Sequence, residues 1–80
     1  MRVTARLTSP ADVGVVLQQA RLERGLSQAE LAAEVGFPQS VISQMESGQS
    51  TAYLRRLLRL AGATGIDLRA SWEADDAPGG

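Results

Sequence analysis

Four of the eight glycines in this 80-residue sequence each follow a segment that carries apolar residues at helical spacing. Gly25 suits the left-handed residue that commonly ends a helix, and Gly36 suits the positive φ of a tight turn between helices. Gly48 and Gly65 follow two further helical segments. These glycines leave two helices of only about two turns each between residues 25 and 48. Helices this short are not stable alone, so they must pack against each other and against longer neighbours. The sequence therefore predicts one small, mainly α domain of four helices.

Helix-start signals predict where three of these helices begin. Ser9 supplies an N-cap hydroxyl and is followed by a proline and by Asp12 in the first turn. Ser27 and Glu30 have the spacing of a capping box. A polar link ends at Thr51, a plausible N-cap for the last helix. The helices are predicted over residues 10–24, 27–36, 38–47 and 52–64.

Both ends of the sequence alternate between apolar and polar residues, which is the period of a half-buried strand. Residues 1–8 are interpreted as a weak strand, with a mobile arm as the alternative. In the C-terminal strand, the apolar set is Ile66, Leu68, Ala70 and Trp72. The predicted organisation is an arm or strand at 1–8, a helical domain at 9–65, a strand at 66–73 and a frayed tail at 74–80.

Several functions are excluded by residue types that the sequence lacks. It has no cysteine and no histidine, which removes disulfides, thiolate and imidazole metal ligands, and the usual Cys and His catalytic groups. It also has no lysine and no glycine-rich phosphate loop, and its acids fall at capping, pairing or tail positions. We therefore expect a protein that is not an enzyme and that needs no metal and no cofactor.

Composition also limits the surroundings and partners of the protein. No apolar run approaches the roughly 20 residues of a membrane span, so a cytoplasmic location without membrane contact is expected. All eight cationic residues are arginines, and the formal net charge is −1. Nucleic-acid binders often carry a basic excess, so the bulk charge neither supports nor excludes DNA binding, and the placement of charges must decide.

A set of residues within 25–48 matches a known pattern. The set is Leu26-Ser27-Gln28, Glu30-Leu31-Ala32, Val35-Gly36, Ile42-Ser43, and Glu46 followed two positions later by Gly48. With its flanking helices, over residues 10–65, it resembles the helix-turn-helix domains of the Xre/Cro/phage-repressor family. The resemblance implies a four-helix, lambda-repressor-like fold whose third helix lies in the major groove of DNA.

The same resemblance implies which residues touch DNA. Base contacts fall to the polar residues of the third helix, which are Gln39, Ser40, Ser43 and Gln44. A glutamine amide pairs with the adenine edge, and a serine hydroxyl pairs with donors or acceptors. Phosphate contacts fall to Gln28, and in second place to Gln49 and Ser50. The simpler alternative is that these residues only make the surface polar.

Other residues match structural positions of the family or depart from its pattern. Arg21 and Glu46 match an ion pair that joins the first helix to the third, so we expect their role to be structural. Pro38 stands where the family usually has Ser, Thr or Lys, which removes a hydroxyl cap and a DNA contact. We interpret three arginines of the last helix as part of its solvated surface, with contact to DNA phosphates as the alternative. They are Arg55, Arg56 and Arg59.

Beyond residue 65 the sequence is similar to HipB-type antitoxins, in which a C-terminal β-strand replaces a fifth helix. The resemblance implies a homodimer in which strands of two subunits pair, with Trp72 buried there. It implies a sequence-specific DNA-binding regulator, the antitoxin and autorepressor of a HipBA-type type II toxin–antitoxin operon. Its partners would be a double-stranded DNA operator and a HipA-type kinase toxin. The alternatives are a phage-type or metabolic repressor without a toxin, and a protein-interaction module that has lost DNA binding.

Overall fold

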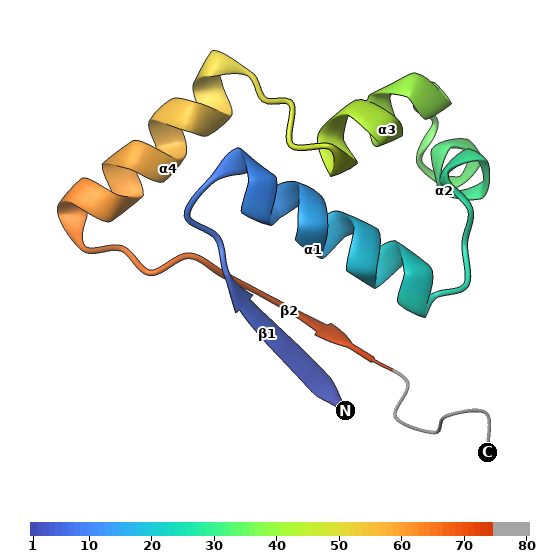
Figure 1. Cartoon of the computed structure of the whole chain (residues 1–80), viewed down its shortest axis with the longest axis horizontal. Helices are drawn as coiled ribbons and strands as arrows, with labels where there is room; N and C mark the ends of the chain where they lie inside the picture. Colours follow the sequence, from blue (N-terminus) through green and yellow to red (C-terminus); the bar gives the residue numbers. More distant parts are fainter. Residues whose placement is uncertain (75–80) are drawn as a thin grey trace.

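The computed structural model describes residues 1–74, in which four helices lie beside a two-stranded sheet (Figure 1). The helices are α1 Pro10–Glu23, α2 Gln28–Val35, α3 Gln39–Glu46 and α4 Ala52–Thr64, and the strands are β1 Arg2–Arg6 and β2 Arg69–Glu73. This architecture confirms the predicted, mainly α fold class. Apart from residue 74, the predicted tail lies outside the described residues. No helix within 1–74 is long and apolar enough to cross a membrane.

Side-chain caps begin three of the helices. The Ser9 hydroxyl accepts a hydrogen bond from the Asp12 N–H at 3.2 Å, and the Asp12 carboxylate accepts one from the Ser9 N–H at 3.2 Å. Ser27 and Glu30 make the same reciprocal pair at the start of α2, at 3.0 and 2.8 Å. The Thr51 hydroxyl caps α4. Each cap satisfies backbone donors that a helix leaves unpaired at its first turn.

The strands β1 and β2 pair antiparallel, with Val3 opposite Trp72. The C-terminal strand thus has a partner in its own chain, where the sequence resemblance implied one in a second subunit. It also begins later than residue 66, so Ile66 and Leu68 precede it. The Ile66 N–H donates to the Ala61 carbonyl at 2.8 Å, which makes Ile66 part of the C-terminal cap of α4 and leaves it exposed. Alternation of apolar and polar residues predicts a strand that needs a neighbour, but it does not indicate which chain supplies that neighbour.

The apolar core is small, and α1 and α3 approach each other closely within it. A Cβ placed on Gly14 of α1 would lie 2.5 Å from the Glu46 carbonyl oxygen and 2.7 Å from the Met45 carbonyl oxygen of α3. Only glycine permits this approach of two backbones. Eleven large apolar side chains within residues 1–74 remain more than a third exposed. The buried apolar residues are Ala32, Ile42, Leu58 and Ala61.

Candidate nucleic-acid interface

A tight turn at Gly36 joins α2 to α3. Gly36 has φ 79° and ψ 24°, and its N–H donates to the Ala32 carbonyl at 2.9 Å. The Phe37 N–H donates to the same carbonyl at 3.0 Å. A side chain at this left-handed position would strain the backbone. Pro38 then occupies the N-cap of α3, which has no side-chain cap, and the helix begins at Gln39, one residue later than predicted.

Arg21 of α1 and Glu46 of α3 form a buried ion pair. The distance from Arg21 Nε to Glu46 Oε2 is 2.6 Å, and that from Nη2 to Oε1 is 3.0 Å. Their side chains are 8% and 4% exposed. Arg21 Nη1 also donates to the Leu26 carbonyl at 2.7 Å. Two parallel hydrogen bonds fix the orientation of a guanidinium and a carboxylate, so this pair holds the last turn of α3 against α1.

Gln28 belongs to the same cluster. Its Nε2 donates to Glu46 Oε1 at 3.1 Å, and the side chain is half-buried at the start of α2. The bond joins residues 18 positions apart. No sequence signal indicates it, because either side chain has many other possible partners. The phosphate contact assigned to Gln28 by resemblance stays a prediction, and this bond positions its amide between α2 and α3.

The residues predicted to contact bases share the solvent-facing side of α3. Ile42 and Glu46 face the opposite way, toward α1 and α2. Within residues 1–74, no side-chain hydrogen bond engages the polar side chains of this face. They are therefore available to an external partner. The four residues, all exposed, are Gln39, Ser40, Ser43 and Gln44.

The link after α3 holds the two remaining predicted phosphate contacts. Gln49 is exposed, and its backbone N–H donates to the Gln44 carbonyl at 3.1 Å. Ser50 is half-buried, and its carbonyl oxygen and hydroxyl accept from Arg55 Nη1 at 3.1 and 3.0 Å. Ser50 therefore ties an arginine of α4 to the link that follows α3. Sequence reasoning missed this bond.

Two further contacts were not predicted. Arg24 and Glu34 form an exposed bidentate pair between the end of α1 and α2, at 2.8 and 3.0 Å. No residue pattern in the sequence signals it. The close approach at Gly14 does have a signal, because an isolated glycine inside a helical pattern often marks a packing requirement.

The Arg21 guanidinium holds the pKa of Glu46 below its ordinary value, and the hydrogen bond from Gln28 acts in the same direction. A carboxyl group whose folded pKa lies below its unfolded pKa stabilises the fold fully above the unfolded pKa. That stabilisation is lost as the pH falls through the lowered value. We therefore expect the protein to lose stability in acid partly through Glu46.

Thermal unfolding followed between about pH 7 and about pH 3 tests this expectation. The Glu46→Gln variant should be less stable than the natural protein near neutral pH and should lose less stability on acidification. Part of the acid dependence should remain, because hydrogen bonds or ion pairs also lower the pKa of Asp12, Glu30, Glu34 and Asp67. Parallel pH profiles in the two proteins would contradict the role given to Glu46.

Two short helices joined by a glycine turn, the second of which has an unengaged polar face, define a helix-turn-helix domain. The chain belongs to the helix-turn-helix family, whose sequence model matches residues 17–70.

The relatives of this chain include regulators and bridging factors. It is 34% identical over 70 residues to the uncharacterised HTH-type transcriptional regulator y4mF of Sinorhizobium fredii, covering 85% of this chain and 92% of that protein. It is 40% identical over 57 residues to multiprotein-bridging factor 1 of Candida albicans, and 36% identical over 58 residues to endothelial differentiation-related factor 1 of Homo sapiens. These matches cover 71% and 72% of this chain but only 38% and 39% of those longer proteins. No solved structure matches the chain.

Proposed function

We propose that this protein is a sequence-specific DNA-binding transcriptional regulator that reads the major groove with α3. The unengaged polar face of α3 carries the proposal, because its glutamine and serine side chains can pair with base edges. The buried Arg21–Glu46 pair supports it, since a reading helix must be held rigidly to discriminate between bases. The regulator y4mF, which matches most of this chain, is named for the same class of activity.

We propose further that the protein acts as a homodimer on two half-sites of a near-palindromic operator, about 34 Å apart or a multiple of that distance. Two observations support a dimer. Large apolar side chains remain exposed within residues 1–74, and a second subunit would cover part of this surface. Each strand of the two-stranded sheet also has an unpaired edge within the described chain, and such an edge is a template for another strand.

The particular role we propose is that of antitoxin and autorepressor in a type II toxin–antitoxin operon. Its support is the resemblance of the sequence beyond residue 65 to HipB-type antitoxins. A HipA-type kinase would be the toxin partner. Relief of kinase-induced growth arrest by co-expression of this protein would separate the antitoxin from a repressor without a toxin.

A protein-interaction module is the second candidate, and an apolar hollow between α1, α2 and α3 favours it. The hollow has a volume of about 220 Å³ and is lined mainly by apolar side chains. Val35 and Phe37 at its rim are 46% and 51% exposed. The Candida relative is named as a factor that bridges proteins. A protein that acted only in this way would not discriminate between DNA duplexes.

Replacing Gln39 by alanine tests the reading helix. Loss of a bidentate contact to adenine should weaken operator binding about 5- to 150-fold, equivalent to about 1–3 kcal/mol. Binding to a scrambled duplex should change little, because non-specific binding depends on phosphates. Fluorescence anisotropy with the DNA upstream of the gene, and with a scrambled duplex of equal length at the same salt concentration, measures both affinities.

The matched control for this experiment is Gln19→Ala, which removes an exposed glutamine from α1 and should leave both affinities unchanged. An equal loss on the two duplexes in Gln39→Ala would show that Gln39 does not read bases. If the intact protein fails to select its upstream DNA even at low salt, the regulator proposal is wrong and the interaction module takes first place.

A further inference from the structure

Unneutralised positive charge is concentrated on α4. This helix carries three arginines, and residues 47–66 contain no Asp and no Glu. Within residues 1–74, no carboxylate pairs with any of the three. By contrast, carboxylates pair with four other arginines of the chain, which are Arg6, Arg21, Arg24 and Arg69. The three unpaired cations of α4 are Arg55, Arg56 and Arg59.

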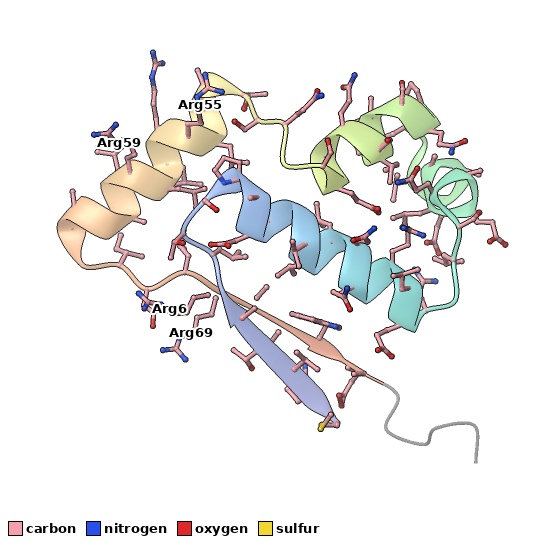
Figure 2. The ribbon with its side chains drawn as sticks, in the orientation of Figure 1. Arg6, Arg55, Arg59 and Arg69 are labelled. Carbon is pink, nitrogen blue, oxygen red and sulfur yellow. The ribbon has the colours of Figure 1, made fainter. Side chains whose placement is uncertain are left out.

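Two of these arginines share one side of the helix. Arg55 and Arg59 are one turn apart, and Figure 2 shows both pointing away from α1 and the sheet. Arg6 and Arg69 lie elsewhere, at the end of the sheet near α4, where both pair with Asp67. The Arg55 and Arg59 side of α4 therefore keeps its charge.

Arg55 is positioned by the segment that follows the reading helix. Its Nη1 donates to both the carbonyl and the hydroxyl of Ser50, in the link that leaves α3. An arginine has five N–H donors, so Nε and Nη2 remain available to an anion. Arg56 has a different setting, because it lines a hollow with Tyr53, Leu57 and Leu60.

The arrangement is unfavourable for the isolated helix. Like charges one turn apart repel each other, and positive charge near the start of a helix opposes the helix dipole. The first turn of α4 contains no acid that would offset this. Anions bound at these guanidinium groups would offset both penalties, and arginine suits the geometry of a phosphate.

We propose that Arg55 and Arg59 form a phosphate clamp that grips the DNA backbone beside the groove entered by α3. The ligand is the phosphodiester backbone of duplex DNA, and Ser50 holds Arg55 in place for it. This inference rests on the proposed function, and it gives α4 a share in binding affinity that carries no sequence selectivity.

The salt dependence of DNA binding tests the clamp. Each phosphate that the protein neutralises adds about 0.9 to the slope of log affinity against log salt. In Arg55→Ala and Arg59→Ala, the slope of log affinity against log salt should become shallower by about 0.9 for each phosphate that is no longer neutralised. The change should be the same on operator and scrambled duplexes. Arg59→Lys, which keeps the charge, should retain most of the slope. Arg56→Ala is the matched control on the same helix and should retain all of it.

Because the scrambled duplex lacks the operator sequence, the salt dependence measured on it does not depend on base recognition by α3. If the natural protein does not select its operator, the proposed regulator fails, while a reduced slope on scrambled DNA still supports the clamp. If operator selection is intact and neither Arg55→Ala nor Arg59→Ala changes the slope, the clamp is overturned and the regulator stands. A slope reduced equally by Arg56→Ala would also overturn it, because the effect would then come from general charge.

Discussion

Replacing Gly14 by alanine should destabilise the protein, although alanine is the better helix former. The new Cβ would lie 2.5 and 2.7 Å from two backbone carbonyl oxygens of α3, which cannot rotate away as a side chain would. Overpacking costs about 1–3 kcal/mol, and a clash with backbone belongs at the upper end. After the gain of about 1 kcal/mol in helix propensity, we expect a net loss of about 2 kcal/mol.

Gly62 of α4 is the matched control. A Cβ there would meet nothing within 4 Å, so Gly62→Ala should stabilise the protein by up to about 1 kcal/mol. Denaturant unfolding of the two variants gives both signs in one experiment. In a domain of this size each kcal/mol moves the unfolding temperature by about 4–8 °C. A Gly14→Ala variant as stable as Gly62→Ala would show that α1 and α3 do not approach each other as described.

Replacing Glu46 by alanine should have a still larger effect. Removing one partner of a buried ion pair costs about 3–5 kcal/mol, because the remaining charge is buried without compensation. A small domain has only about 5–15 kcal/mol of total stability, so this variant should be largely unfolded at moderate temperature. Circular dichroism and denaturant unfolding measure the loss.

Two comparisons separate the effect of burying an ion pair on stability from the effect of ion pairing itself. The exposed pair of Arg24 and Glu34 has the same bidentate geometry, but its side chains are 59% and 48% exposed, so Glu34→Ala should change stability little. The double variant Arg21→Met/Glu46→Leu should recover much of the loss, because apolar residues of similar size replace both buried charges. Equal effects of Glu34→Ala and Glu46→Ala would contradict this account.

Local signals in the sequence predicted the helices well, because caps and stops act within a few residues. Ser9, Ser27 and Thr51 each cap the helix assigned to them, and Gly25 and Gly36 adopt the positive φ expected of them. The start of α3 was less accurate, since Pro38 fits both an N-cap and a first helical position.

Contacts between distant residues were harder to predict. The alternation over 66–73 indicated a strand, but the strand begins only at Arg69 and β1 of the same chain is its partner. The bonds from Gln28 to Glu46 and from Arg55 to Ser50 depend on how helices and loops are oriented in space. For the candidate interface, the sequence and its family resemblance indicated which polar residues of α3 to consider. The structure added which of their neighbours are engaged and which arginines remain unpaired.

The pairing of β1 with β2 has a consequence for the order in which the protein folds. Arg2 lies opposite Glu73, so the sheet closes a loop that contains all four helices. The entropy lost in closing a loop grows with its length, and contacts between distant positions form slowly. Contacts among α1, α2 and α3 span much shorter stretches of chain. The three helices should therefore assemble first, the sheet should form last, and the two ends of the described chain should be the first part to open.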